Sequence, residues 1–320
     1  MKLLIFYLTN SQRHYTFPHY INLLNQSQKK DQWKLLILAN DEPTEFYKAE
    51  IAANTQGINY ASVSVYYEAE NNYMVKARYA NQMATDAGIP YMMKCDNDIF
   101  LKPDVLDYMI DHLDILENPA HLTLGPILTT GIPGVEYFID QFLDPAAKNH
   151  LETMFAHTPF YPICGVDYSP LNKHTVDTPG QSWDKTAFFD AVRQMNHHYK
   201  GIHPIRVKIH NIGYLNDYII ANKTRFMEPK TMGLITTDNS PYLCNSIYCI
   251  KTETYHKILN TPELYVDMFD EVPLNKYAWQ NNMNHVFVEN GFAIHMYYNW
   301  EPNFIEHERH FCKMFFEENK

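Results

Sequence analysis

The sequence has few of the features that mark disulfide-rich, zinc-binding or membrane proteins. Its five cysteines form no CxxC pair and leave an odd one over, which argues against a disulfide framework and a structural zinc site. Its longest apolar runs, residues 3–8 and 35–39, are far shorter than the roughly 20 residues that span a membrane. The start of the chain also lacks the anatomy of a signal peptide. We therefore expect a cytoplasmic protein with reduced thiols and no transmembrane segment.

Positive charge is also scarce. The chain has 26 Lys and Arg against 37 Asp and Glu, a formal net charge of −11. This balance makes broad electrostatic binding to nucleic acid or anionic lipid unfavourable, although a local basic pocket can still hold a phosphorylated ligand. With 46% hydrophobic and 20% charged residues, the 320 residues can bury a large core as one elaborated domain or two smaller ones.

The most informative stretch is an acidic Asp-x-Asp motif at the end of a short apolar segment, residues 91–95. On an extended strand, Asp96 and Asp98 would share one face, and at a strand end both can reach a cation together with the phosphate oxygens of a ligand. Carboxylate oxygens suit Mg²⁺ or Mn²⁺, which keep positions for water and phosphate. The alternative is a solvated turn, because Asp and Asn hydrogen-bond their own backbone.

The flanks of this motif favour the metal-binding interpretation. Upstream, residues 73–87 carry apolar side chains at helical spacing, and Gly88 and Pro90 end the predicted helix. Downstream, Pro103 can occupy the first turn of another helix, whose apolar residues continue to Leu113. The carboxylates thus follow a strand that lies between two helices, the place where open α/β sheets bind ligands.

The first third of the chain predicts an α/β fold. Residues 2–8 and 34–38 are short apolar runs typical of buried strands, and residues 58–67 give a third strand. Helices are predicted between them, at residues 17–28 and 46–54. The order β-α-β-α-β-α-β implies a mainly parallel sheet with right-handed crossovers and helices on both faces.

The motifs described so far resemble a known family. The run from Lys76 to Asn81 on a helix, then the Asp96-Asn97-Asp98 strand end and a helix start at Lys102-Pro103-Asp104, is similar to the central motif of GT-A-type nucleotide-sugar glycosyltransferases, especially the large inverting family that makes bacterial polysaccharides. The resemblance implies a GT-A-like, Rossmann-like sheet. It also implies a divalent cation, Mn²⁺ or Mg²⁺, as cofactor.

The resemblance further assigns roles to individual residues. It implies that Thr9, Asn10 and Asp41 hold the base and ribose, and that Lys76 or Arg78 neutralises the diphosphate; Asp96 would lie near the ribose or the metal, and Asp98 would bind the metal. Each also has an ordinary structural interpretation, such as a helix cap for Asp41 or a surface charge for Arg78. One departure is that Asp41 is followed by Glu42-Pro43, where the family often has two adjacent acids and a Gly-Ser turn.

Three further candidates lie in the last third of the chain. Asp270 and Glu271 stand at the start of a predicted helix, and His295 lies in the second of two short predicted strands, 286–288 and 292–297, joined by a turn at Asn290-Gly291. This order resembles the family's acceptor-side acid followed by a metal-binding histidine. Either acid would be the general base, and the sequence does not choose between them. Alternatively, the acids stabilise the positive end of the helix, and His295 packs in the core.

The middle of the chain departs from the resemblance. Residues 127–232 are rich in Tyr, His, Pro and Asn, and prolines divide them into short pieces with helices near 135–142 and 186–197. We expect an irregular insertion that recognises the acceptor. The predicted division is therefore a nucleotide-sugar-binding part (1–126), this insertion (127–232) and a part that completes the catalytic domain (233–320), all in one structural domain.

Together these features predict a metal-dependent glycosyltransferase, of hexosyltransferase type. It would transfer a sugar, with inversion, from a nucleoside-diphosphate sugar, by default a UDP-sugar, to a hydroxyl acceptor. The acceptor could be a glycan, a lipid-linked sugar reached at the membrane face, or a small molecule. One alternative is a sugar-1-phosphate nucleotidyltransferase, which usually has a Gly-rich basic loop after the first strand; residues 9–13 contain no glycine. A non-catalytic nucleotide-sugar- or glycan-binding protein is another.

Overall fold

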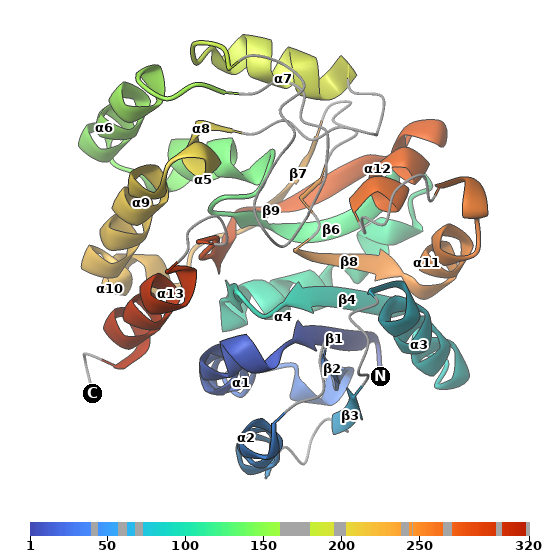
Figure 1. Ribbon diagram of the computed structural model, residues 1–320. Coiled ribbons are helices and arrows are strands. Elements are labelled where there is room, and N and C mark those ends of the chain that lie inside the picture. The colour runs from blue at the N-terminus through green and yellow to red at the C-terminus, as the bar shows by residue number, and fades with distance from the viewer. Residues whose placement is uncertain are drawn as a thin grey trace.

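A computed structural model describes the fold of residues 1–39, 44–56, 63–67, 73–160, 180–194, 203–237, 243–244, 246–264, 271–298 and 303–317, with the backbone alone for residues 63, 64, 67, 191–194 and 271. One sheet of nine strands runs through the molecule (Figure 1). The strands are β1 (Leu3–Thr9), β2 (Trp33–Ala39), β3 (Val63–Tyr67), β4 (Tyr91–Asp96), β5 (Ile99–Leu101), β6 (His121–Leu128), β7 (Gly233–Thr236), β8 (Ile247–Lys251) and β9 (Asn284–His295). Their order is β3-β2-β1-β4-β8-β6-β9-β5, and β7 pairs with β9.

Helices cover the sheet and connect its strands. They are α1 (Phe17–Leu24), α2 (Glu45–Thr55), α3 (Tyr73–Asp86), α4 (Pro103–Asp111), α5 (Gly134–Phe142), α6 (Pro145–Ala156), α7 (Lys185–Gln194), α8 (Pro204–Val207), α9 (Ile209–Ala221), α10 (Lys223–Met227), α11 (Thr252–Leu259), α12 (Glu271–Gln280) and α13 (Phe304–Cys312). Shorter turns of helix are η1 (Ser11–Thr16), η2 (Lys30–Gln32), η3 (Leu113–Glu117), η4 (Pro262–Leu264) and η5 (Lys313–Glu317). None of the helices in the described ranges has the length and apolarity that a membrane span requires.

The N-terminal half of the sheet is parallel, as the sequence predicts. Strand β1 pairs in parallel with β2 on one side and β4 on the other, and β2 pairs in parallel with β3. All seven residues of β1 are buried, because both faces of the strand are covered, which explains the continuous apolar run in the sequence. The register sets Leu8 opposite Asp96 and Thr9 opposite Ala39. The carboxyl ends of β1, β2 and β4 therefore meet at one edge.

The C-terminal half of the sheet is mixed. Strand β8 runs antiparallel to both β4 and β6, β9 runs parallel to β6, and β5 runs antiparallel to β9. Only Asn97 and Asp98 separate β4 from β5, although these two strands lie four positions apart in the sheet. Three Cα–Cα steps reach at most about 11 Å, whereas four strand spacings in a flat sheet measure about 19 Å. The sheet must therefore curl and bring β5 and the end of β9 back toward β4.

The predicted turn at Asn290-Gly291 within β9 is wrong. The segment at Asn290-Gly291 is not a reversing turn: β9 continues through it and stays parallel to β6 on both sides. Pro126 faces Val288 and the next residue, Ile127, faces Phe292, so residues 289–291 form a bulge. Asn290 has a φ of 59°, a left-handed conformation that Asn tolerates at bulges as well as in turns.

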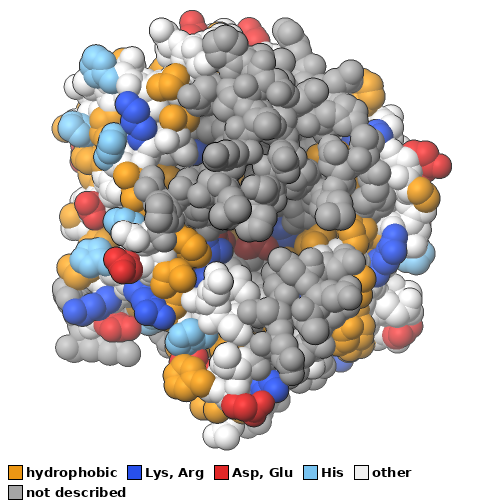
Figure 2. All heavy atoms as spheres, viewed as in Figure 1, with side chains coloured by type: hydrophobic (Ala, Val, Ile, Leu, Met, Phe, Trp, Pro, Cys, Tyr) orange, Lys and Arg blue, Asp and Glu red, His pale blue; other side chains and the backbone are white. Residues whose placement is uncertain are grey.

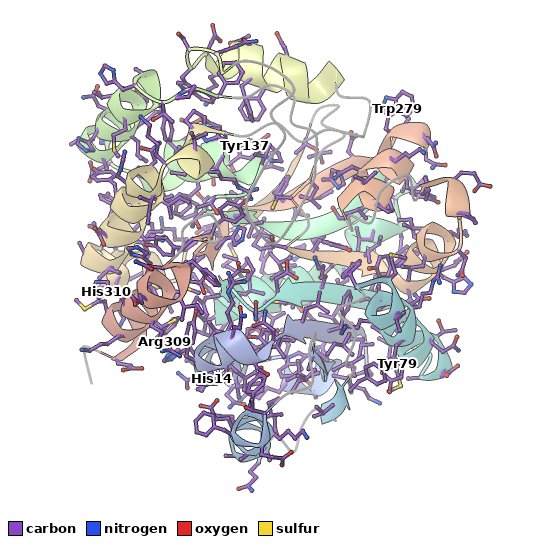
Figure 3. The ribbon with its side chains drawn as sticks, viewed as in Figure 1. His14, Tyr79, Tyr137, Trp279, Arg309 and His310 are labelled. Carbon is purple, nitrogen blue, oxygen red and sulfur yellow. The ribbon has the colours of Figure 1, made fainter. Side chains whose placement is uncertain are left out.

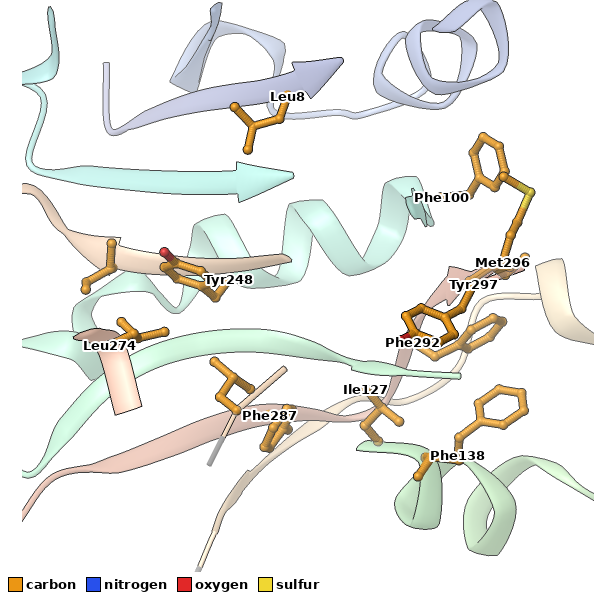
Figure 4. Close-up of a cluster of buried hydrophobic side chains, with 14 of the residues drawn as sticks. Leu8, Phe100, Ile127, Phe138, Tyr248, Leu274, Phe287, Phe292, Met296 and Tyr297 are labelled. Carbon is orange, nitrogen blue, oxygen red and sulfur yellow. The ribbon is translucent and has the colours of Figure 1, made fainter. Parts of the chain in front are cut away.

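The two largest hydrophobic clusters of the described residues lie on opposite faces of the sheet. Because side chains alternate along a strand, Leu4, Phe6 and Leu8 of β1 enter one core, while Leu3, Ile5 and Tyr7 enter the other. The first core packs against residues from α3, α5, α9, α11 and α12, and the second against residues from α1, α2 and α4. Figure 4 shows part of the first core, with Phe138 of α5 and Phe292 of β9 near the strands. The predicted α/β class with helices on both faces is confirmed.

The middle region is more helical than the sequence predicts. Helices α5 and α7 coincide with the predicted ones, but α6 and α9 were not predicted. Pro145 is the first residue of α6, and Asp144 before it accepts hydrogen bonds from the backbone N of Ala146 and Ala147 at 3.0 and 2.9 Å. Side chains of α5, α6 and α9 belong to the same core cluster as the strands.

Phe138 provides a test of this packing. Its ring is fully buried and lies against the rings of Phe142, Phe226 and Phe292. We expect Phe138→Ala to lower the free energy of unfolding by about 3–5 kcal/mol, because it removes a large buried side chain and leaves a cavity. The matched change Phe46→Ala, at a side chain 63% exposed, should cost less than about 1 kcal/mol. Urea denaturation of both variants measures the difference, and equal losses would contradict this account of the core.

Candidate active site

The candidate site lies where β4 ends and β5 begins. Asp98, in the two-residue connection, is buried, with 4% of its surface exposed. Its Oδ2 atom lies 3.6 Å from Nε2 of His295 and 3.5 Å from Nη1 of Arg13. The space-filling view shows acidic and basic side chains side by side near the centre of the face turned to the viewer (Figure 2). The structure therefore brings together Asp98 and His295, two residues that the sequence analysis proposed for the metal.

Backbone pairing places His295 beside Asp98. In the β5–β9 ladder, Ile99 is opposite His295, and the backbone N of Met296 donates to the carbonyl oxygen of Asp98 at 3.2 Å. The position of His295 thus follows from the strand register, not only from the contact between the two side chains. A shift of one residue would turn His295 to the other face of the strand.

Two threonines after β6 hold the His295 ring. The hydroxyl of Thr130 donates to the carbonyl oxygen of His295 at 3.3 Å and lies 3.0 Å from Nδ1 of the same residue. Thr129 accepts from the backbone N of His295 at 3.0 Å. These contacts fix the ring with Nε2 toward Asp98, which is its hydrogen-bonding partner.

This arrangement fits a divalent cation. An ionised carboxylate and an imidazole nitrogen that has released its hydrogen are both metal ligands, and Oδ2 of Asp98 lies 3.6 Å from Nε2 of His295. Two ligands at about 2.1 Å from one ion lie roughly 3.0–3.4 Å apart, close to the distance seen here. Within the described ranges, no group of three His, Cys, Asp or Glu side chains could hold a metal, so water and ligand phosphates would have to complete the coordination.

The surroundings set the charges of this pair. Burial alone would raise the pKa of Asp98, but the neighbouring Arg13 and His295 hold it well below its usual range. Burial lowers the pKa of the His295 imidazole; Asp98 opposes this effect, and Arg206 and Arg13 add to it. Asp98 is consequently ionised and His295 is favoured in its neutral form at pH 7, the protonation states that a metal ligand requires.

Arg13 and Glu308 complete the site, and neither was among the predicted site residues. The guanidinium of Arg13 makes a bidentate pair with Glu308, through Nε at 2.9 Å and Nη2 at 2.8 Å, and its Nη1 lies 3.4 Å from Oδ1 of Asn97. The Tyr15 hydroxyl donates to Glu308 at 2.6 Å. Burial raises the pKa of Glu308, and Arg13 opposes this rise. A basic residue just after the first strand was the only sequence signal, since Glu308 lies 295 residues away.

Arg206, from the middle region, supports the same site and was also missed. Its Nε donates to the carbonyl oxygen of Thr130 at 2.8 Å, and its guanidinium lies 4.0 Å above the ring of Tyr297. Arg206 is buried, with 4% of its surface exposed. Residues of the predicted insertion therefore hold the loop that orients His295.

The remaining predicted residues occupy different surroundings. Asp96, at the end of β4, is partly exposed, and its carboxylate lies 3.3 Å from Nζ of Lys94. Thr9 is fully buried and shares a hydrogen bond with the hydroxyl of Tyr47. Asn10 caps η1 and accepts from the backbone N of Arg13 at 3.0 Å. Asn10 thereby orients the loop that carries Arg13.

Lys76 and Arg78 lie on α3. Lys76 is fully buried, whereas Arg78 donates to the carbonyl oxygen of Leu259 at 3.2 Å and so joins α3 to α11. Asp41 and Asp270 lie outside the described residues, and for Glu271, the first residue of α12, the structure describes the backbone alone. The ligand-binding and catalytic roles of these five residues stay predictions.

Comparison with known proteins shows distant likenesses only. No protein-family model matches the sequence, and no curated protein is significantly similar to it. GalNAc-T7, solved with UDP, GalNAc and Mn²⁺, matches over 98% of this chain and 48% of its own, with 10% identity and a TM-score of 0.49. The mannosyltransferase PcManGT from Pyrobaculum calidifontis, in complex with GDP-Man and Mn²⁺, matches over 39% of this chain and 35% of its own, with 10% identity and a TM-score of 0.33.

A cytidylyltransferase from Leptospira borgpetersenii serovar Hardjo-bovis is also similar. It matches over 48% of this chain and 73% of its own, with 14% identity and a TM-score of 0.31. The present chain spans about a third of the length of the mannosyltransferase and about half that of GalNAc-T7. These likenesses are too weak to assign an activity, which must be argued from the site itself.

The depressed pKa of Asp98 predicts a pH-dependent contribution to stability. The contribution is fully present above the unfolded-state pKa, about 3.9, and is lost as the pH falls toward the lower folded-state value. We expect the difference in unfolding free energy between the protein and its Asp98→Asn variant to be constant above about pH 5 and to shrink at lower pH. Urea denaturation between pH 7 and pH 2.5 measures it. Parallel stability curves over the whole range would contradict the assignment.

Proposed function

We propose that this protein is a metal-dependent glycosyltransferase that moves a sugar from a nucleoside-diphosphate sugar to a hydroxyl acceptor. The observation that carries the proposal is the Asp98–His295 pair, a buried carboxylate and a buried imidazole 3.6 Å apart at the edge where the parallel strands end. Ligand phosphates and a divalent cation are expected at this edge of an open α/β sheet. The Asp-x-Asp motif and its flanking helices supply the same expectation from the sequence.

In this proposal, the residues of the chain divide the chemistry between them. Asp98 and His295 would hold Mn²⁺ or Mg²⁺, with Asp96 near the ion or the ribose. When bound, the ion supplies charge relief for the departing diphosphate. Thr130 keeps His295 oriented with Nε2 toward Asp98. Arg13 adds a fixed positive charge 3.5 Å from Asp98 at the same end of the sheet.

The other predicted residues complete the proposed substrate site. Thr9, Asn10 and Asp41 would lie along the base and ribose, and Lys76 or Arg78 would face the diphosphate. Asp270 or Glu271 would accept the proton of the acceptor hydroxyl, which gives inversion at the anomeric carbon. The default donor is a UDP-sugar, and the acceptor a glycan, a lipid-linked sugar or a small molecule. We also propose that the protein is cytoplasmic, either free or peripherally associated with the membrane.

Metal-dependent donor binding tests the central pair. We expect Asp98→Asn to weaken Mn²⁺-dependent binding of UDP by about a hundredfold or more, because the variant loses a charged ligand worth several kcal/mol. Calorimetric titration with UDP, GDP, CMP and dTDP, each with and without Mn²⁺, gives the affinities and identifies the nucleotide. The control is Asp86→Asn, an exposed carboxylate that accepts from Gln82, which should leave binding unchanged. Unaltered metal-dependent affinity in Asp98→Asn would remove the metal role.

Turnover tests the predicted base and separates an enzyme from a binding protein. Glu271→Gln should retain donor binding and lose about 10²–10⁴-fold in transfer rate, because the acceptor hydroxyl loses its general base. The companion variant is Asp270→Asn, and a larger loss there would move the assignment by one residue. Donor binding without transfer or donor hydrolysis by the unaltered protein would instead indicate a binding protein. Formation of a nucleotide sugar from a nucleoside triphosphate and a sugar-1-phosphate would indicate a nucleotidyltransferase.

A further inference from the structure

Glu308 belongs to the candidate site although it lies close to the end of the described chain. It is fully buried on α13, and its two carboxylate oxygens accept from Nε and Nη2 of Arg13 and from the Tyr15 hydroxyl. The ring of Phe304, one helical turn earlier, lies 5.2 Å from the guanidinium of Arg13. Arg309 of α13 lies 5.0 Å from the ring of Tyr15, and Figure 3 shows Arg309 near His14 of η1. Helix α13 is thus docked on the loop that follows β1.

Arg13 is shared unequally between two carboxylates. Its contacts to Glu308 are short and bidentate, at 2.8 and 2.9 Å, whereas its Nη1 is 3.5 Å from Asp98. A bidentate, charge-assisted pair is the stronger of the two geometries. The geometry therefore binds the guanidinium more closely to Glu308 than to Asp98.

The net charge of Glu308, Arg13 and Asp98 affects how strongly the site attracts a cation. Glu308, Arg13 and Asp98 together carry one net negative charge, which attracts a divalent ion. Without Glu308, Arg13 and Asp98 alone would sum to zero, and the guanidinium could close onto the oxygen that a metal would need. Removing one partner of a buried ion pair leaves the other without compensation, so Arg13 would gain by moving to Asp98.

We propose that Glu308 of helix α13 sets the affinity of the Asp98–His295 pair for a divalent cation by holding Arg13 away from Asp98. Glu308 is a positioning residue in this scheme, since it acts through Arg13. The inference rests on the proposed metal-dependent function, but it adds that the C-terminal helix determines whether the ion can bind. It also predicts that any change that undocks α13 weakens metal binding.

Direct titration with Mn²⁺, followed by electron paramagnetic resonance without any nucleotide, tests this scheme in the full chain. Glu308→Gln should bind Mn²⁺ about 10- to 100-fold more weakly, the range that one charge-assisted hydrogen bond contributes. The double variant Arg13→Gln, Glu308→Gln should bind at least as tightly as the unaltered protein, because the competing cation is gone. Recovery in the double variant would not occur if Glu308 only stabilised the fold.

A matched control is available at the opposite end of the sheet. Glu117 accepts from the Tyr91 hydroxyl at 2.7 Å and from Nζ of Lys251 at 2.6 Å, so it has the same kinds of partner as Glu308. Tyr91 begins β4, at the end of the strand remote from Asp98. Glu117→Gln should therefore leave the affinity for Mn²⁺ unchanged.

The outcomes separate this inference from the proposed function. If the unaltered protein binds Mn²⁺ and Glu308→Gln binds equally well, only the role of Glu308 is wrong. The same conclusion follows if the double variant is as weak as Glu308→Gln. If the unaltered protein binds no Mn²⁺ with or without UDP, the proposed metal dependence and this inference both fail. If Glu308→Gln does not fold, the double variant alone tests the inference. A weaker affinity for Mn²⁺ in the double variant than in the unaltered protein then overturns it.

Discussion

The pairing of β5 with the end of β9 is the constraint on which the candidate site depends. Only two residues connect β4 to β5, and the sheet must curl to let β5 reach its partner. The same ladder sets Ile99 opposite His295 and brings the backbone of Asp98 to Met296. The curl and the site are consequently one feature of the fold. In a flat sheet of the same strands, the β5–β9 ladder with Asp98 and His295 would lie too far from the end of β4 for a two-residue connection.

The buried charges around Asp98 follow from that geometry. Asp98 receives partial compensation from Arg13 and His295, and Arg13 is itself bound more tightly by Glu308. A chain of buried polar contacts therefore runs from α13 through Arg13 and Asp98 to His295, and from there through Thr130 to Arg206. Buried polar groups are costly unless each has its partners, so this network favours one arrangement of the surrounding elements. It connects the N-terminal, middle and C-terminal parts of the chain at a single place.

Much of the first half of the fold could be predicted because its signals are local. The buried run in β1, the helical spacing along α3 and the proline at the start of α4 each lie within a few residues. The bulge at Asn290 was mistaken for a turn, because Asn-Gly favours both and only the partner strand decides between them. Helices α6 and α9 were not predicted, although Asp144 and Pro145 form a local start signal for α6.

The sequence by itself determined the strands and helices of the N-terminal half, the acidic motif at the end of β4, and the choice of Asp98 and His295 as candidates. Local apolar runs, helical spacing and end signals predict the strands, the helices and the motif, whereas the choice of His295 came from the resemblance to a known family. Only the tertiary structure decided which charges face Asp98. Arg13 and Glu308 are 295 residues apart and meet because α13 docks on the loop after β1. No local pattern encodes such a pair, since it depends on the curl of the sheet and on the packing of elements far apart in the chain.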